Sequence, residues 1–490
     1  MRHFKSGSDI RGIAIDDVNS RNITLTDDVI KRISMGFVEH LSRTFGIKIS
    51  DLKISIGHDS RLSANRIKSA IVSALSPMIA TIFDCGLSST PTMFRSINHF
   101  NCHGSIMITA SHHPADRNGL KFFTPEGGVS SADIDLILKL AESAEIMAES
   151  ARQNIENADF LTMYSASLRK IICDKLSSDE SENLLKGLKI TVDAGGGAGG
   201  FFATEVLAKL GADISSSVLL EPDGMFKTHV PNPEDEAAVE YLKTAVLSAK
   251  SDFGVIFDTD VDRSGFVDAS GMEINKSALV ALVAAIVLEK NPGATIVTDS
   301  ATSHDLTRFI ESLGGAHHRF KRGYANVINE AKRLNSVGEN AILAIETSGH
   351  AAFKDNDFID DGAYLACLIV AKMVEMKRAG KSLLDLIKDF KLPESAVEKR
   401  INIKHSNFKD YGEKVIADFK KHLEKHGYSK AHDDHEGARM HHNGGRHFAA
   451  LRLSVHDPVL IANVESYAEN ASEVMDFLEM FFEKFADLML

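Results

Sequence analysis

The chain has 490 residues, which is more than one hydrophobic core supports, so we expect three or four domains. Hydrophobic residues make up 44% of the sequence, which excludes an intrinsically disordered chain. The formal net charge of −13 argues against nucleic acid and anionic membranes as partners, because both attract basic surfaces.

The N-terminal stretch MRHFKSGSDIRG contains basic residues but no apolar segment of the kind found in export signals. The longest apolar run, residues 278–288, is too short for a membrane helix and predicts a buried helix. The widely spaced cysteines predict reduced, buried thiols at Cys85, Cys102, Cys173 and Cys367. We therefore expect a cytoplasmic protein that does not bind membranes.

Strand and helix patterns then alternate along the chain, as is typical of α/β domains with helix-covered sheets. Three runs predict a strand, a polar or glycine-rich loop and a helix: LKISIGHDSR (52–61), LKITVDAGGGAGG (188–200) and ATIVTDSATS (294–303). After each, a second apolar strand ends in a polar loop: SIMITASHHP (105–114), FGVIFDTDVDR (253–263) and AILAIETSGH (341–350). This repetition predicts three similar mixed α/β domains in tandem, comprising residues 1–155, 156–273 and 274–393.

The pattern changes after about residue 393. A strand, a helix, three strand-like runs and a C-terminal helix over residues 472–488 predict a smaller α+β domain comprising residues 394–490. This domain contributes a fourth polar loop, LRLSVHDP (451–458). Because ligands bind outside the carboxyl ends of strands in open α/β sheets, we expect the four loops to meet in a central cleft.

The loop of residues 258–263 contains three aspartates at alternate positions: Asp258, Asp260 and Asp262. If the preceding strand continued, the three carboxylates would share one side and suit a hard cation such as Mg²⁺. An EF-hand is excluded, because Arg263 and Ala269 stand where it requires Gly and Glu. A phosphatase with an aspartyl nucleophile is excluded because Asp262 occupies the fifth position of its motif.

Ser111 ends a strand-like run but lies in neither a GxSxG nor an SxxK motif, so a hydrolase is unsupported. A serine near Lys121, with three acids elsewhere, fits phosphoryl transfer, in which a cation and basic groups neutralise charge and Lys121 moves a proton. The alternative is a turn residue that caps the following segment.

Three further patterns are weaker. Gly195, Gly197 and Gly200 fit GxGxxG and leave a dinucleotide site as an alternative, although such turns are common without a nucleotide. The ETSGH stretch combines a carboxylate, hydroxyls and an imidazole that can bind sugar hydroxyls. Arg452 and Ser454 offer phosphate ligands.

Together the loops resemble the α-D-phosphohexomutase family over residues 4–468. TASHHP is similar to its phosphoserine loop, with His113 where Asn is usual, and NGLK places Lys121 at its general acid/base. DTDVDR is similar to the metal loop DGDGDR, with Thr259 and Val261 in place of glycines.

The remaining loops also resemble family segments. ETSGH is similar to the sugar-recognition loop GExSGH, with Ile345 where Gly is usual, and FKRGY (320–324) is similar to its companion loop. SDIRG (8–12) and GHDSRLS (57–63) match further segments. LRLSVHDP lacks the Gly-Thr-Glu of the family's RPSGTEP loop, which favours the phosphomannomutase/phosphoglucomutase branch.

The resemblance implies reversible phosphoryl transfer between C1 and C6 of glucose or mannose phosphate, through a phosphoserine and a hexose 1,6-bisphosphate. The implied catalytic residues are Arg11, Ser111, His112 and Lys121. The implied Mg²⁺ ligands are phosphorylated Ser111 and Asp258, Asp260 and Asp262. The implied substrate-binding residues are Arg263, Lys321, Glu346, Ser348, His350, Arg452 and Ser454.

Glucose 1,6-bisphosphate is the implied activator, hexose phosphates are the implied partners, and the implied assembly is a monomer or homodimer. Two alternatives stay open. One is a phosphoglucosamine or acetylglucosamine-phosphate mutase, and the other is a sugar-phosphate-binding protein without catalytic activity.

Overall fold

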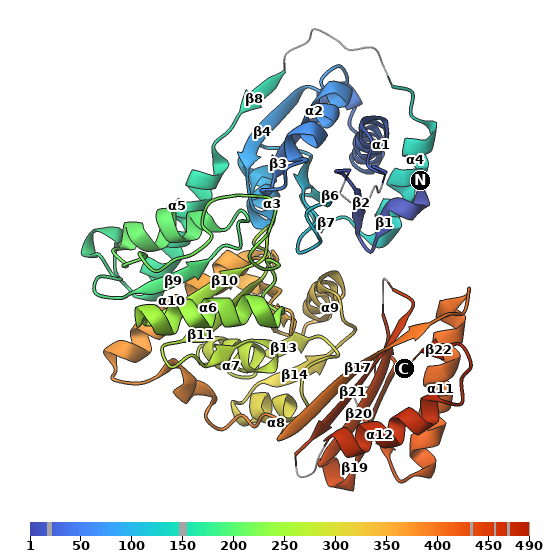
Figure 1. Ribbon diagram of the computed structural model, residues 1–490. Coiled ribbons are helices and arrows are strands. Elements are labelled where there is room, and N and C mark those ends of the chain that lie inside the picture. The colour runs from blue at the N-terminus through green and yellow to red at the C-terminus, as the bar shows by residue number, and fades with distance from the viewer. Residues whose placement is uncertain (17–21, 147–153, 432–434, 455–456, 468–470, 490) are drawn as a thin grey trace. The chain divides into compact units, whose positions relative to one another are not determined.

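The computed structural model describes residues 1–16, 22–146, 154–431, 435–454, 457–467 and 471–489. It divides the chain into two compact units, of which the first comprises residues 1–275 and 348–383 and the second residues 276–347 and 384–490. The strands form four sheets, and Figure 1 labels most of the helices and strands.

The first sheet has eight strands in the order β1-β2-β6-β5-β3-β4-β8, with β7 paired to β6. They are β1 (Lys5–Ser6), β2 (Asp9–Ile13), β3 (Lys53–His58), β4 (Thr81–Leu87), β5 (Gly104–Ile108), β6 (Arg117–Thr124), β7 (Gly127–Gly128) and β8 (Ile155–Asn157). β3 is parallel to β4 and β5, whereas β5 and β6 are antiparallel, with Met107 opposite Lys121. This pairing brings Lys121 close to the end of β5, after which Ser111 follows.

Helices cover both faces of this sheet because successive strand residues point to opposite sides. Ile106 and Ile108 of β5 belong to a core with α1 (Asp27–Phe45), α2 (Ala64–Leu75) and α4 (Ser131–Ser143). Met107, between them, belongs to a second core with α3 (Thr90–His99). α3 begins at a Ser89 cap, whose hydroxyl accepts from the Thr92 amide.

The second sheet has the order β12-β11-β10-β9, in which β9 and β10 are parallel and β10 and β11 antiparallel. Its strands are β9 (Ile190–Asp193), β10 (Phe253–Phe257), β11 (Ser264–Asp268) and β12 (Glu273–Ile274). The same unit contains α5 (Phe160–Lys175), a π-helical segment (Phe202–Leu207), α6 (Glu236–Ala249) and α10 (Gly362–Arg378).

The glycine-rich loop after β9 supports the aspartate loop after β10. A Cβ on Gly197 would lie 2.8 Å from Thr259 Cα, and the Ala198 amide donates to Thr259 O at 2.8 Å. The Gly195 amide donates to Asp193 Oδ1 at 2.8 Å and the Gly196 amide to a main-chain carbonyl at 2.9 Å. Because these amides are already used, the loop does not offer the phosphate-binding donors of a dinucleotide site.

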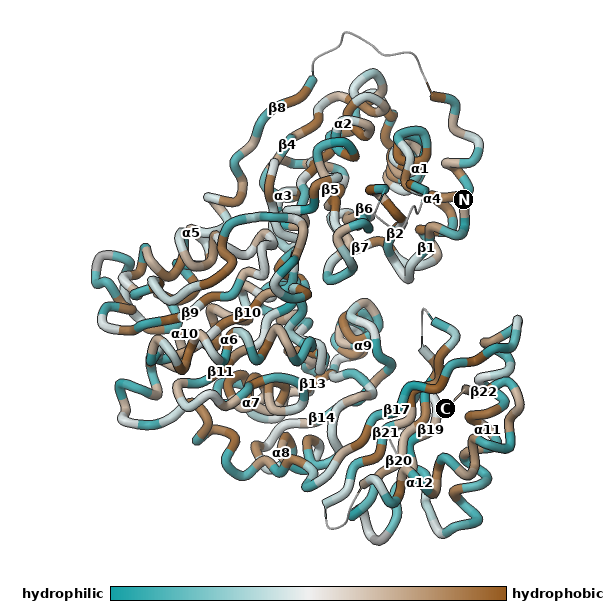
Figure 2. The backbone as a smooth tube through the Cα atoms, in the orientation of Figure 1, coloured by the Kyte–Doolittle hydropathy of each residue, from teal (hydrophilic) through white to brown (hydrophobic). Residues whose placement is uncertain are grey.

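In the second unit, the third sheet contains parallel strands in the order β14-β13-β15. Its elements are β13 (Thr295–Thr298), β14 (Ala316–Arg319), β15 (Ala341–Ile345), α7 (Lys276–Leu288), α8 (Asp305–Ser312) and α9 (Tyr324–Ser336). The apolar run of residues 278–288 lies in α7, which is largely buried and is drawn as hydrophobic in Figure 2. β16 (Ala351–Phe353) follows the ETSGH loop in the first unit.

The fourth sheet has six antiparallel strands in the order β18-β19-β20-β21-β17-β22. Its elements are β17 (Ser395–Ile403), β18 (Ser429–Lys430), β19 (Ala438–His442), β20 (His447–Leu453), β21 (Val459–Ser466), β22 (Leu488–Met489), α11 (Phe408–Lys425) and α12 (Ala471–Phe482). α11 and α12 pack on the sheet through a shared core that contains Phe419 and Phe482. The helix predicted over residues 472–488 is wrong at its end, because Leu488 pairs with Ile403 of β17.

The predicted order of three mixed α/β domains followed by a smaller α+β domain is confirmed, whereas the predicted boundaries stay a prediction. All four cysteines are buried and form no disulfide. Within the part of the chain that the structure describes, no helix combines the length and the apolarity needed to cross a membrane.

A buried histidine makes the stability of the second sheet depend on pH. His229 Nε2 lies 2.9 Å from Asp193 Oδ2 and its Nδ1 lies 3.0 Å from Val230 O, so both ring nitrogens face acceptors. Burial lowers the pKa of His229, but the bond to Asp193 outweighs burial, and the net pKa is raised. The imidazolium therefore stabilises the fold below the pKa of the unfolded chain, and this contribution is lost as pH rises through the folded pKa.

We predict that His229→Gln lowers the melting temperature more at about pH 6 than at about pH 8.5, because Gln does not become charged. The expected loss at the lower pH is about 1–3 kcal/mol. The measurement is thermal unfolding of both proteins across this pH range, with exposed His405→Gln as the control. An equal loss at both pH values would contradict the assignment of a charged His229.

Candidate active site

Ser111 follows β5 and adopts a left-handed backbone conformation, with φ of 50°, which is uncommon for a residue other than glycine. Its Oγ donates to Asp258 Oδ2 at 2.9 Å and accepts from Arg263 Nη2 at 3.0 Å. The hydroxyl is thus held by a carboxylate and a guanidinium of the loop between β10 and β11, and it does not cap the segment that follows. Ser111 does lie in a turn, as the alternative expects, but the capping role of that alternative is wrong.

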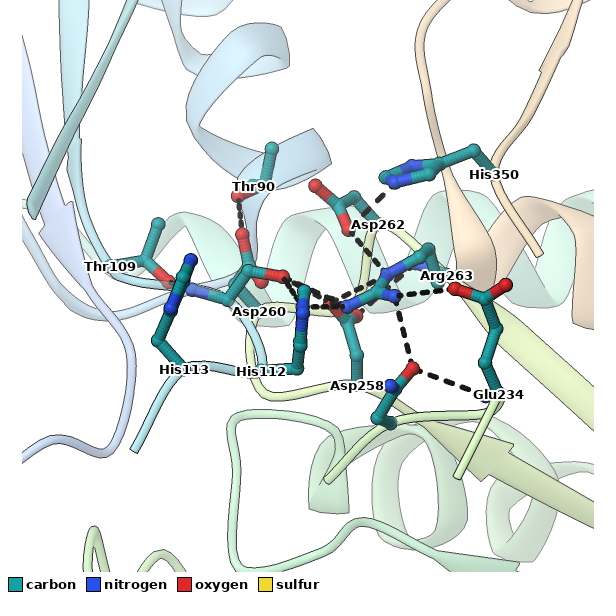
Figure 3. Close-up of polar contacts among 12 residues, drawn as sticks. Thr90, Thr109, His112, His113, Glu234, Asp258, Asp260, Asp262, Arg263 and His350 are labelled. Atoms are coloured by element: carbon teal, nitrogen blue, oxygen red, sulfur yellow. Dashed lines mark hydrogen bonds and ion pairs between the residues drawn. The ribbon is translucent and has the colours of Figure 1, made fainter. Parts of the chain in front are cut away.

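Asp258, Asp260 and Asp262 are buried, and one carboxylate oxygen of each lies within 4.8 Å of those of the other two. The prediction that a continuing strand aligns them is wrong, because β10 ends at Phe257 and the chain turns. Val261 has a φ of 64° in this turn. The turn, rather than the alternation of a strand, gathers the three carboxylates, and Figure 3 shows them around Arg263.

Two basic side chains compensate these carboxylates. Lys121 Nζ donates to Asp260 Oδ2 at 2.8 Å and also to Asp262 Oδ2. Arg263 Nη2 donates to Asp258 Oδ2 at 3.0 Å. Both the lysine and the arginine are buried.

The other oxygens, Asp260 Oδ1 and Asp262 Oδ1, are buried and have no hydrogen-bond partner. A buried carboxylate oxygen without a partner is costly, so the arrangement favours a bound cation. Carboxylate oxygens are the ligands that Mg²⁺ prefers. The residues of this loop therefore fit a Mg²⁺ site.

Two carboxyl groups of the cluster have pKa values shifted in opposite directions. Burial raises the pKa of Asp258 well above its usual value, and the charge of Asp262 raises it further. Burial also raises the pKa of Asp262, but Lys121, His350 and Arg263 outweigh it and the net pKa is lowered. An additional positive charge would favour the ionised form of both groups.

His112, the residue after Ser111, and Arg11 of β2 make further contacts at the Ser111 loop. His112 Nδ1 lies 2.8 Å from Arg263 Nη2, and burial together with the charge of Arg263 lowers the pKa of His112 to about 2. The ring is therefore neutral and accepts from Arg263. Arg11 donates to Thr109 O and, at 2.9 Å, to Asp9 Oδ2, which holds the end of β5.

The ETSGH segment contributes His350 and Ser348 to the first unit, and both are at most partly exposed. His350 Nδ1 lies 2.6 Å from Asp360 Oδ2 and 3.9 Å from Asp262 Oδ1. Burial lowers the pKa of His350, but Asp360 and Asp262 outweigh it and raise the pKa to about 9. A charged imidazole therefore lies beside the aspartate loop.

The other predicted substrate residues belong to the second unit. Glu346 is buried and accepts from the Gly323 amide, whereas Lys321 is exposed. Burial lowers the pKa of Arg452, and the charge of the neighbouring Arg322 lowers it further. Two guanidinium groups are thus close together in this unit.

Ser454 is half-buried, and its Oγ accepts from the Asp457 amide at 3.3 Å. The two residues between them, Val455 and His456, lie outside the described residues.

Sequence reasoning missed two residues that contact the cluster. The Thr90 amide donates to Asp260 O at 2.8 Å, and Thr90 Oγ1 donates to Asp260 Oδ2. Asp360 contacts His350, as described above. The helix-start pattern Ser-Thr-Pro predicts the beginning of α3, but nothing in it indicates a contact with a loop 170 residues away.

Three family models match the chain, and their descriptions are phosphoglucomutase/phosphomannomutase alpha/beta/alpha domains I, II and III. They match residues 3–146, 163–271 and 275–391, respectively.

A phosphomannomutase of Salmonella typhimurium is 31% identical over 389 residues, which cover 78% of each chain. A phosphoglucomutase of Neisseria gonorrhoeae is 28% identical over 468 residues, covering 95% of this chain and 93% of the relative. The crystal structure of a phosphoglucomutase/phosphomannomutase family protein from Burkholderia thailandensis has a similar fold, with a TM-score of 0.78 and 23% identity, covering 99% of this chain and 97% of that one. The chain belongs to the phosphoglucomutase/phosphomannomutase family.

We predict that saturating Mg²⁺ raises the melting temperature of the protein, because a cation would bind the oxygens of Asp260 and Asp262 that lack a hydrogen-bond partner. Ligand linkage gives about 2.7 kcal/mol when free Mg²⁺ is about 100 times its Kd. Asp260→Asn should lose most of this shift, whereas Glu240→Gln, which removes an exposed carboxylate on α6, should keep it. An Asp260→Asn protein with the full shift would place the cation elsewhere.

Proposed function

We propose that the protein is a phosphohexomutase that moves a phosphoryl group between C1 and C6 of glucose or mannose phosphate. The observation that carries this proposal is the position of Ser111 Oγ, within hydrogen-bond distance of Asp258 and Arg263 beside a three-carboxylate cation site. Such a hydroxyl can carry a phosphoryl group whose charge is met by the guanidinium and the cation. Membership of the family supports the same chemistry.

In the proposed cycle, the resting enzyme is phosphorylated on Ser111. Attack by the C6 hydroxyl of a hexose 1-phosphate breaks the Oγ–P bond and forms an O6–P bond, which gives the hexose 1,6-bisphosphate. Return of the C1 phosphoryl group to Ser111 leaves the hexose 6-phosphate. The cycle explains why free glucose 1,6-bisphosphate would activate the protein, since it phosphorylates Ser111 directly.

Lys121 is the proposed acid and base. Its Nζ lies next to Asp260 and Asp262, close to the Asp258 carboxylate that holds Ser111. In its amine form it takes the proton of the attacking sugar hydroxyl and passes it to the departing Ser111 Oγ. In the second transfer it takes the proton of the Ser111 hydroxyl and passes it to the sugar oxygen that is released. Bound Mg²⁺ would supply charge neutralisation at the transferring phosphoryl oxygens, and Asp258, Asp260 and Asp262 would hold it.

Other residues have proposed roles in orientation. Arg263 donates to Ser111 Oγ and would donate to phosphoryl oxygens there. His112, neutral beside Arg263, and Arg11 hold the serine loop. The proposed ligands of the sugar and its second phosphate are Lys321, Glu346, Ser348, His350, Arg452 and Ser454, and we add Arg322, which lies near Arg452.

The test is ³¹P NMR of the purified protein with Mg²⁺, a trace of glucose 1,6-bisphosphate, and glucose 1-phosphate or mannose 1-phosphate. Growth of the 6-phosphate signals is expected, and the ratio of the two rates gives the sugar preference. Conversion of only an amino-sugar phosphate would favour the alternative mutase. No conversion of any of these sugars would favour a binding protein, although such a protein has no need of Ser111, Lys121 and the three aspartates.

We predict that Ser111→Ala reduces mutase activity to background, because no other side chain replaces the carrier oxygen. The melting temperature should change little, since the methyl group fits the space of the hydroxymethyl group. The measurement is the same NMR assay together with thermal unfolding. Full turnover by this variant would show that Ser111 is not the phosphoryl carrier.

We predict that Arg452→Ala raises the KM for hexose phosphates by about tenfold or more, as expected for loss of a charge-assisted bond to phosphate. Arg446→Ala is the matched control, because Arg446 is an exposed arginine close to the same strand, β20. Steady-state kinetics of both variants would decide the question. An equal KM for the two variants would remove Arg452 from the phosphate site.

A further inference from the structure

The carbonyl groups of the Ser111 loop accept hydrogen bonds from a buried arginine, Arg61, that has no role in the proposed chemistry. Arg61 follows β3 and is 2% exposed. Its Nη1 donates to the carbonyls of Pro114 and Arg117 at 2.8 and 2.9 Å. Its Nη2 donates to the carbonyl of His113 at 2.7 Å and to that of Ser111. One guanidinium therefore donates to four carbonyl oxygens of the segment of residues 111–117.

A second group holds the amide side of the same serine. The Ser111 amide donates to Thr109 Oγ1 at 2.9 Å, and Thr109 Oγ1 donates to Asp59 Oδ2 at 2.7 Å. Asp59 Oδ2 also accepts from Arg61 Nε at 3.2 Å. These hydrogen bonds form a closed ring around the backbone of the serine. The ring runs from the Ser111 amide through Thr109, Asp59 and Arg61 to the Ser111 carbonyl.

Ser111 needs this support because its backbone is in the left-handed region. A residue other than glycine is strained there and keeps this conformation only where its surroundings determine it. The conformation also decides the direction of Oγ, which must reach Asp258 and Arg263.

Arg61 is itself enclosed by a turn of the second sheet's domain. Its guanidinium lies 5.1 Å from the ring centroid of Phe226, a cation–π contact. A Cβ on Gly224 would lie 2.4 Å from the carbonyl of Ser60, so this turn lies against the chain next to Arg61. Enclosure keeps water from competing for the four carbonyls.

We propose that Arg61 is a positioning residue that fixes the left-handed backbone of Ser111 and thereby directs its hydroxyl for phosphoryl transfer. The kinetic part of this inference rests on the proposed function. Arg61 does not touch the substrate; it acts through the backbone carbonyls of residues 111–117. A guanidinium is required because it is a planar fork with five donors, whereas an ammonium has three donors on one atom.

The first test is Arg61→Lys, which keeps the buried positive charge beside Asp59. We expect kcat to fall about 10- to 100-fold, because a displacement of about 1 Å at a reacting group has an effect of this order. The KM for hexose phosphates should change less than about threefold, because the substrate contacts are untouched. The melting temperature should fall, because buried carbonyls lose donors, and amide hydrogen exchange should become faster over residues 109–117 than over the rest of the first sheet.

Arg66→Lys is the matched control. Arg66, on α2, also donates to two backbone carbonyls, Ala14 O at 2.9 Å and Leu25 O at 3.0 Å, but it does not contact the serine loop. It should keep the parent kcat and the parent exchange over residues 109–117. An Arg61→Lys protein with unchanged kcat and unchanged exchange would overturn the proposal, as would an effect confined to KM.

Thr109→Val provides a second variant if Arg61→Lys does not fold. It removes the bond to the Ser111 amide while leaving Arg61 and Asp59 in place, and it should lower kcat and accelerate exchange in the same segment. An effect on neither would overturn the proposal. If the parent protein has no mutase activity, the proposed function fails, and the hydrogen-exchange comparison still decides whether Arg61 fixes the loop.

Discussion

Three carboxylates buried within one short loop repel one another, and the arrangement of the first unit depends on compensating that repulsion. Asp258 and Asp262 are ionisable groups removed from water, which is expensive unless opposite charges are close. Lys121 comes from the first sheet and Arg263 from the loop itself. Removing one partner of such a buried pair typically costs about 3–5 kcal/mol. The two sheets of this unit therefore stabilise each other through their charged loops.

The same constraint explains the position of Ser111. Arg263 contacts both Asp258 and the serine oxygen, so the group that compensates a carboxylate also orients the hydroxyl. β5 and β6 are antiparallel neighbours, which places Lys121 and the serine loop at one end of the sheet. The side chain that compensates the charge of Asp258 is thus the one that orients the Ser111 hydroxyl. Moving the hydroxyl would therefore disturb the ion pair between Arg263 and Asp258.

Much of this could be predicted from the sequence, because strand periodicity and the polar residues that end strands are local signals. The loops of Ser111 and Asp258 were found in this way, and the order of the α/β domains followed from their repetition. The contacts of Thr90 and Asp360 could not be predicted, since each depends on segments brought together only by the folded chain. The aspartates were expected to lie together because alternate residues of a strand share one side. They lie together instead because the chain turns after β10 and brings their side chains toward one point.

Thr259 and Val261, which replace glycines of the family's metal loop, show what determines the shape of that loop. Val261 keeps a φ of 64° although its side chain makes this conformation unfavourable by about 1–2 kcal/mol. Its carbonyl accepts from the Gly362 amide at 3.1 Å, and the Thr259 backbone lies against Gly197. This strain is smaller than the cost of separating a buried carboxylate from Lys121 or Arg263. The ion pairs and the packed neighbours therefore impose the turn. Glycine makes the turn easier, but in this chain it is the compensation of the aspartates that maintains it.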